Sequence, residues 1–74
     1  MVLEKYIAEW AGRKRISQTP KEKYLTVCRE EDGIAVLADV NGKIFKVPLK
    51  DKKLLFLTLD LLYAEWKLKN LERM

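Results

Sequence analysis

The sequence predicts an α+β domain in the order α-β-β-β-α, in which a three-stranded antiparallel meander packs against two helices. Two observations carry this prediction. Segments with helical periodicity stand at both ends of the chain, and three short runs rich in β-forming residues lie between them, separated by Asp32-Gly33 and Asn41-Gly42. A length of 74 residues suffices for one small core and not for two, so residues 1–74 are expected to form a single domain.

The first helix is expected over about residues 2–16. Leu3, Ile7 and Trp10 are spaced four and three residues apart, which places their side chains in one apolar stripe. Because proline cannot continue a helix and restricts the residue before it, the segment 17–20 is expected to be a linker.

Three extended runs, 24–29, 34–40 and 43–49, are expected to be strands. The segment 30–33 is predicted to be the first turn, with Asp-Gly at its end. Asn41-Gly42 is the strongest hairpin signal in the chain, because these residue types tolerate the positive φ that a type I′ turn needs at both central positions.

The third run alternates in a way that predicts two faces. Phe45, Val47 and Leu49 are expected on one face of this strand, and Ile44 and Lys46 on the other. Pro48 cannot donate a hydrogen bond to a neighbouring strand, so the end of this strand is expected at an edge of the sheet.

Asp51 is expected to cap a last helix that runs from Lys52 to about Arg73. The apolar residues of this helix fall into two rows. The residues of the first row are spaced three, four, three, four and three apart: Leu54, Leu57, Leu61, Ala64, Leu68 and Leu71. The second row, about a quarter-turn away, consists of Leu55, Leu59, Leu62 and Trp66.

A helix that is apolar nearly all round must be covered on more than one side. The sheet and first helix of so small a domain cover one side, which leaves the other for a second subunit. We therefore expect a homodimer with the first row as the candidate interface, although periodicity alone does not decide which row faces the chain's own sheet. Asp60, an acid among leucines, is a candidate partner for a lysine of the other copy, where it would fix the register of the dimer.

The residue types present exclude most catalytic sites. The chain has no histidine, which excludes Ser-His-Asp and Cys-His catalysis and any histidine-ligated metal. Cys28 is the only cysteine, so neither an internal disulfide nor a thiolate zinc site can form, and packing is its expected role. No paired or clustered carboxylates indicate a hydrolase. We therefore expect no enzyme, no metal, no cofactor and no small-molecule substrate.

The start of the chain does not resemble a secretory signal, because Glu4, Lys5 and Glu9 stand where a basic region and an apolar run would be. The longest apolar stretch, residues 54–63, is interrupted by Thr58 and is too short to span a bilayer. A cytoplasmic protein without membrane association is therefore expected. The scarcity of Asn and Gln beside abundant Lys and Glu points to a thermophilic source.

The basic residues concentrate in two places. The chain carries 15 Lys and Arg against 11 Asp and Glu, a formal charge of +4. One group is Arg13, Lys14 and Arg15 near the end of the first helix, and the other is Lys43, Lys46, Lys50, Lys52 and Lys53 from the third strand to the start of the last helix. Lysines beside the unpaired N–H groups of a helix N-terminus favour phosphate, so these residues are candidate nucleic-acid contacts. An ordinary solvated surface is the alternative interpretation.

Four segments carry a resemblance to a known family: Ile7-Ala8-Glu9-Trp10-Ala11, Pro20 ahead of Tyr24, Val40-Asn41-Gly42-Lys43, and Asp51-Lys52-Lys53. In this order, and over nearly the whole chain, they resemble the motifs of the double-stranded RNA-binding domain. The resemblance implies that the protein recognises an A-form duplex by shape. It also implies that Glu9 and Lys5 face a minor groove and that Lys52 and Lys53 hold phosphates.

Several positions depart from that family. Glu30-Glu31-Asp32 stand in the loop that usually meets the minor groove, and their carboxylates repel a polyanion. Phe56 replaces a third lysine, and Leu55 and Leu59 replace small alanines, so the last helix is expected to be lifted or rotated on the sheet.

The segment from Asn41 to Pro48 is also similar to a strand of the small HicA-type messenger-RNA-cleaving toxins, whose catalytic histidine this chain lacks.

The favoured function is that of a small non-catalytic protein that binds duplex RNA or DNA as a homodimer. The alternative is a protein-interaction or dimerisation module that uses the leucine-rich last helix and binds no nucleic acid. The apolar last helix and the acidic first loop favour the alternative. Trp10 and Trp66 are expected to pack in the core or an interface rather than to stack on bases.

Overall fold

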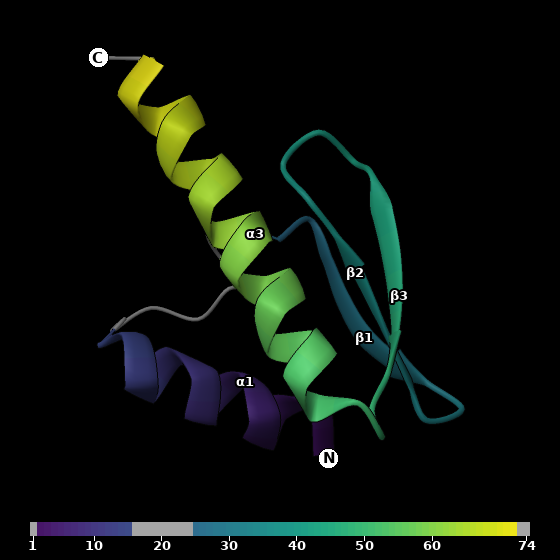
Figure 1. The fold of residues 1–74 in the computed structure, drawn as a ribbon. Helices are drawn as coiled ribbons and strands as arrows, with labels where there is room; N and C mark the ends of the chain where they lie inside the picture. Colours follow the sequence, from purple (N-terminus) through teal and green to yellow (C-terminus); the bar gives the residue numbers. More distant parts are fainter. Residues whose placement is uncertain (1, 16–24, 73–74) are drawn as a thin grey trace.

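The structure is a computed structural model that describes residues 2–15 and 25–72, with side chains described up to residue 69 in the last helix (Figure 1). Its elements are α1 (Val2–Lys14), β1 (Val27–Glu31), β2 (Ile34–Ala38), β3 (Ile44–Pro48) and α3 (Lys52–Glu72). This order confirms the predicted α-β-β-β-α arrangement. The expected linker at 17–20, together with Pro20 and Tyr24, lies outside the described residues.

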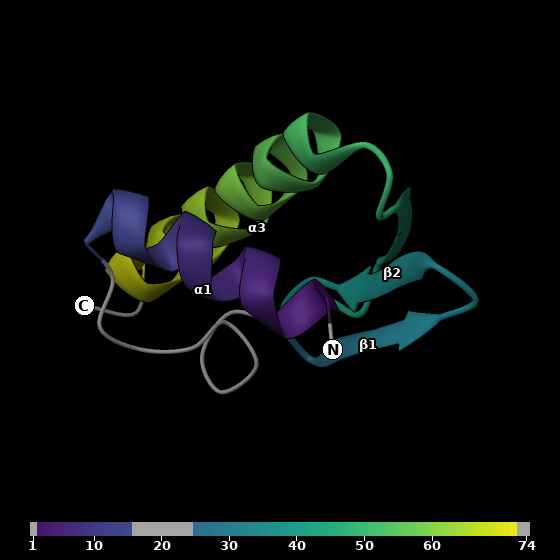
Figure 2. The ribbon, with the colours of Figure 1, turned by 90° about the horizontal axis from the view of Figure 1, so that it is seen from below.

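Both helices lie on the same side of the sheet (Figure 2), whose strand order is β1-β2-β3 with antiparallel neighbours. Alternate strand residues point toward the helices, and Ala35, Leu37 and Val47 are each at most 4% exposed. They pack against the apolar stripe of α1 and one row of α3: Leu3, Ile7, Trp10, Leu55, Leu59 and Leu62. The core therefore lies between the sheet and the two helices.

The exposure of residues along β3 follows the predicted alternation. Val47 and Leu49 are buried, whereas Ile44 on the opposite face is 60% exposed. Because the order is β1-β2-β3, this strand is an edge of the sheet, which accommodates the missing N–H of Pro48.

The first hairpin turn is shorter than predicted. Glu31 pairs with Ile34, so only Asp32 and Gly33 form the turn, with φ angles of 49° and 76°. Positive φ at both positions is the signature of a type I′ turn. Glu30 and Glu31, which we expected in the turn, belong to β1, because this two-residue turn matches the twist of the strands and lets pairing continue to its edge.

The second hairpin turn is longer than predicted. We expected a type I′ turn at Asn41-Gly42, but only Gly42 has positive φ, 85°. The amide of Asp39 donates to Lys43 O at 3.0 Å, and that of Gly42 donates to Asp39 O at 3.0 Å, which defines a three-residue loop. The Asp39 carboxylate explains the difference, since its Oδ1 accepts from the amides of Asn41 and Lys43 at 2.8 Å each.

Asp51 caps α3 as predicted. Its Oδ1 accepts a hydrogen bond from the amide of Leu54 at 3.1 Å, and its carbonyl oxygen accepts from the amide of Leu55 at 3.0 Å. The side-chain contact gives an acceptor to the Leu54 N–H, which a helix start otherwise leaves unpaired, and the carbonyl contact is the first hydrogen bond within the helix. The cap thereby fixes the residue at which α3 begins.

Candidate functional site

The two apolar rows of α3 have opposite environments. Leu55, Leu59 and Leu62 are at most 1% exposed and belong to the core. The row expected at a dimer interface is accessible instead, with exposures of 43% for Leu54, 57% for Leu57, 49% for Leu61 and 62% for Leu68. We call Leu54, Leu57, Leu61, Ala64 and Leu68 the outward row.

The outward row lies on the side of α3 away from the sheet. At 100° per residue, its members fall within about a quarter of the helix circumference, and their centre lies about 150° from that of the buried row, further than the expected quarter-turn. Ala64 is exposed as well. Leu71, the sixth residue of the predicted interface, continues the spacing within α3, but its side chain lies outside the described ones. The five predicted interface residues whose side chains are described thus lie together along one side of α3.

Asp60, which we expected to pair with a lysine of a second copy, contacts residues of its own chain. Its Oδ1 accepts a hydrogen bond from Trp10 Nε1 at 2.8 Å and lies 3.1 Å from Lys14 Nζ. The ring of Tyr63, one turn further along α3, packs edge-on to Trp10 with centroids 5.9 Å apart. These contacts fasten the end of α1 to the middle of α3. Sequence reasoning missed them because the pairing joins opposite ends of the chain.

Glu9 joins two of the predicted nucleic-acid cations. Its Oε2 lies 2.6 Å from Lys52 Nζ and 3.4 Å from a guanidinium nitrogen of Arg13. The hydrogen bond from Lys52 and the nearby positive charges hold the pKa of Glu9 below the usual carboxyl value. Arg13 and Lys52 also lie over the ring of Phe56, at 5.3 and 5.5 Å from its centroid.

Four of the predicted nucleic-acid residues form ion pairs within the chain. Glu9, Arg13 and Lys52 hold α1 against the start of α3, and Lys14 is paired with Asp60. A carboxylate beside each cation partly neutralises its charge and so weakens its attraction to a phosphate. The sequence showed their charges but not their partners, because the positions of Glu9 and Lys52 come together only when the two helices pack.

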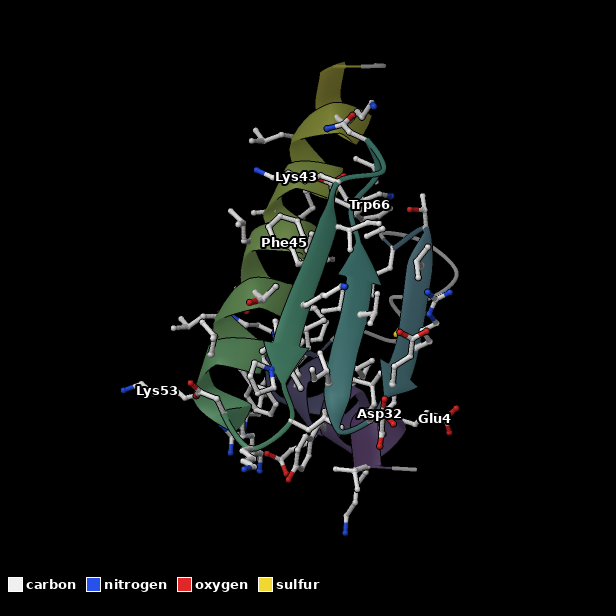
Figure 3. The ribbon with its side chains drawn as sticks, turned by 90° about the vertical axis from the view of Figure 1, so that its right-hand side faces the viewer. Glu4, Asp32, Lys43, Phe45, Lys53 and Trp66 are labelled. Atoms are coloured by element: carbon white, nitrogen blue, oxygen red, sulfur yellow. The ribbon has the colours of Figure 1, made fainter. Side chains whose placement is uncertain are left out.

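The other six predicted nucleic-acid residues are dispersed. Lys43 lies over the ring of Phe45, with 5.5 Å between Nζ and the centroid. The remaining five form no ion pair with another residue of the described part of the chain: Lys5, Arg15, Lys46, Lys50 and Lys53. Lys43 and Lys53 lie toward opposite ends of the sheet when the sheet faces the viewer (Figure 3). The lysines from β3 to α3 therefore form a line along one edge rather than a compact cluster.

Acidic residues gather at the hairpin between β1 and β2. Glu4 and Asp32 lie at the same end of the sheet (Figure 3). Glu30 is used structurally, since its Oε1 accepts a hydrogen bond from the amide of Leu3 at 3.3 Å, at the start of α1. Glu31 pairs with Arg29 at 2.9 Å. The carboxylates therefore make this end of the molecule acidic, and repulsion of a polyanion by this end stays a prediction.

Asp39 is a buried polar residue that sequence reasoning did not single out. It is 3% exposed and organises the second hairpin through two hydrogen bonds to backbone amides. Its own carbonyl oxygen accepts a hydrogen bond from Thr26 Oγ1 at 3.0 Å. The signal was present in the sequence as an Asp two residues before Asn-Gly, a spacing at which an Asp side chain can bond to the backbone of its own turn.

Comparison with known proteins adds no family to this description: no protein-family model, curated protein or solved structure matches the chain. The resemblances to RNA-binding domains and HicA-type toxins therefore stay predictions.

Neither α1 nor α3, as far as they are described, combines the length and apolarity needed to cross a membrane. Within residues 2–15 and 25–72, no three Cys, Asp or Glu side chains come together as metal ligands.

Proposed function

We propose that this domain is a non-catalytic self-association module in which two copies pair through the outward row of α3. The observation that carries the proposal is the exposure of Leu54, Leu57, Leu61 and Leu68, 43–62% each, on one side of a helix whose other side already fills the core. A continuous apolar row of this kind is typical of an interaction surface. The three-four spacing is that of helices that pair along their length.

The exposed area sets the strength expected of this pairing. Burying the accessible half of one leucine contributes about 1 kcal/mol, so four leucines from each copy contribute about 8 kcal/mol. A Kd of about 1 μM corresponds to about 8 kcal/mol, and the loss of translational and rotational freedom opposes association by about 4 kcal/mol or more. The difference of about 4 kcal/mol corresponds to a Kd of about 1 mM, so we expect a weak dimer that forms at high protein concentration.

Sedimentation over a dilution series tests the proposal. The parent protein should shift from dimer to monomer as its concentration falls, and Leu57→Lys and Leu61→Lys should be monomeric throughout while keeping the helical circular dichroism of the parent. Ile44→Lys is the matched control, because Ile44 is 60% exposed but lies on the far face of the sheet. A parent that stays monomeric at millimolar concentration would end the proposal.

Nucleic-acid binding is the second candidate function. Lys46, Lys50 and Lys53 favour it, since they are exposed and pair with no acid among the described residues. Binding to labelled duplex RNA, duplex DNA and single strands should weaken linearly on a log–log plot as salt rises. Replacing all three lysines with alanine should reduce the slope, whereas Lys67→Ala should not. No binding at about 50 mM salt would remove this candidate.

The cytoplasm is the compartment we propose for such a module. Cys28 is the only cysteine and can form no internal disulfide. Stability therefore comes from non-covalent contacts without a disulfide, as is usual for proteins in a reducing compartment.

A further inference from the structure

We propose that the two copies pair in antiparallel orientation, about a two-fold axis that passes between Leu61 and Ala64 of the two α3 helices. This inference rests on the proposed function and deepens it, because it commits to a second copy as the partner and states how that copy lies. Two independent features carry it: the place of Ala64 in the outward row, and the charges on the flank that contains Asp60.

Ala64 is the one small residue in the outward row. The row alternates between two heptad positions, with Leu54, Leu61 and Leu68 in one and Leu57, Ala64 and Leu71 in the other. In a parallel pair each residue faces its own equivalent, so Ala64 would face Ala64 and leave a gap between two leucine layers. In an antiparallel pair the two kinds of position face one another, so Ala64 faces Leu61 of the other copy and every layer contains a leucine.

The flank beside α1 carries opposite charges one heptad apart. Asp60 faces α1 through its contacts with Trp10 and Lys14, and Lys67 follows seven residues later on the same flank. In an antiparallel pair this flank meets the same flank of the other copy, which places Asp60 opposite Lys67 twice. In a parallel pair it meets the other flank, which places Asp60 opposite Glu65, a like charge, and Lys67 opposite Glu72, an opposite charge, so the two contacts offset each other. The charges therefore favour the antiparallel arrangement.

One carboxylate oxygen of Asp60 is available for this second contact. Both of its contacts within the chain are made by Oδ1, and its side chain keeps 39% exposure, so Oδ2 can accept a hydrogen bond from Lys67 of the other copy. The Lys67 ammonium lies 5.3 Å from the centroid of the Tyr63 ring and pairs with no acid among the described side chains. Antiparallel helices also align their dipoles favourably.

Disulfide cross-linking distinguishes the two orientations in the full chain. The background is Cys28→Ala, and the variants are Leu57→Cys, Leu68→Cys and the double variant. In the antiparallel pair Leu57 faces Leu68, whereas the two Leu57 positions lie about 16 Å apart, beyond the reach of a disulfide. We expect the double variant to form a disulfide-linked dimer and neither single variant to do so.

Each other outcome has a definite meaning. Single variants that cross-link with themselves would establish parallel pairing, which overturns this inference and leaves the proposed function standing. Failure of all three variants to cross-link, at a concentration where the parent sediments as a dimer, would also overturn it. A parent that does not sediment as a dimer would remove the proposed function itself.

Charge substitutions give an independent readout of the orientation. Lys67→Glu should raise the dimer dissociation constant several-fold at low salt, because it places two acids opposite each other on both sides of the axis. It would weaken a parallel pair as well, by placing an acid opposite Glu72, so the orientation is decided by Glu65→Lys. Lys46→Glu is the control for Lys67→Glu, since Lys46 is exposed on the same face of the sheet as Ile44, away from α3. Glu65→Lys should change the constant little, because Glu65 then faces Thr58; a clear strengthening by Glu65→Lys would indicate the parallel pair instead.

Discussion

Two alanine substitutions on α3, two residues apart, test the division of this helix into a core row and an outward row. Leu59 is 1% exposed and Leu57 is 57% exposed. Removing a fully buried leucine side chain sacrifices its transfer free energy and leaves a cavity, so Leu59→Ala should lower the free energy of unfolding by about 3 kcal/mol. Leu57→Ala removes a side chain that already contacts water, and its effect on the monomer should stay within about 0.5 kcal/mol.

The assay is urea unfolding followed by circular dichroism, at a protein concentration low enough that dimerisation does not contribute. A domain of this length has a total stability of about 4–11 kcal/mol, so a loss of about 3 kcal/mol remains measurable. Leu59→Met keeps the volume and should lose less than about 1.5 kcal/mol, which ties the effect to packing. Equal losses at the two positions, or a larger loss at Leu57, would mean that the outward row is the one that faces the sheet.

Three further substitutions probe the polar contacts. Asp39→Ala leaves two backbone amides without their acceptor and should lower the free energy of unfolding by about 2–3 kcal/mol. Asp39→Asn keeps one acceptor oxygen and should lower it less. Equal losses for the two variants would contradict the role assigned to Asp39. Trp10→Phe removes the indole donor to Asp60 and should cost about 1–2 kcal/mol in the same unfolding assay, and no loss would show that this bond adds nothing. The lowered pKa of Glu9 beside Lys52 stabilises the folded protein above the usual carboxyl range, and this stability is lost as the pH falls through the folded pKa. Unfolding midpoints of the parent and Glu9→Gln should therefore differ near neutral pH and converge in acid; a constant difference would refute the contribution of this ion pair.

Local sequence signals located the hairpins but did not determine their geometry. Gly33 and Gly42 both adopt positive φ, as Asp-Gly and Asn-Gly predict. The type of the second turn depended on Asp39, a side chain outside the dipeptide whose carboxylate bonds to two amides of the loop. Dipeptide propensity describes the residues of a turn and not a neighbour that competes for the same N–H groups, so the wrong turn type was predicted.

The sequence also did not reveal the partners of the candidate nucleic-acid residues, which lie far from them along the chain. The composition and order of the charges were visible, including the acidic first hairpin. What the sequence did not contain was the approach of α1 to α3, which joins Glu9 to Lys52 and Lys14 to Asp60. These ion pairs turn part of an apparent binding surface into contacts that hold the two helices together.

The sequence by itself determined the order of the elements, the cap at Asp51, the edge position of Pro48 and the two apolar rows of the last helix, because all of these follow from periodicity and local backbone chemistry. Only the tertiary structure decided which row is buried. The two rows are nearly equal in hydrophobicity, and a helix can rotate about its axis without altering any local signal. The packing of Leu55, Leu59 and Leu62 against Leu37, Val47 and the α1 stripe settles that rotation and leaves the outward row exposed.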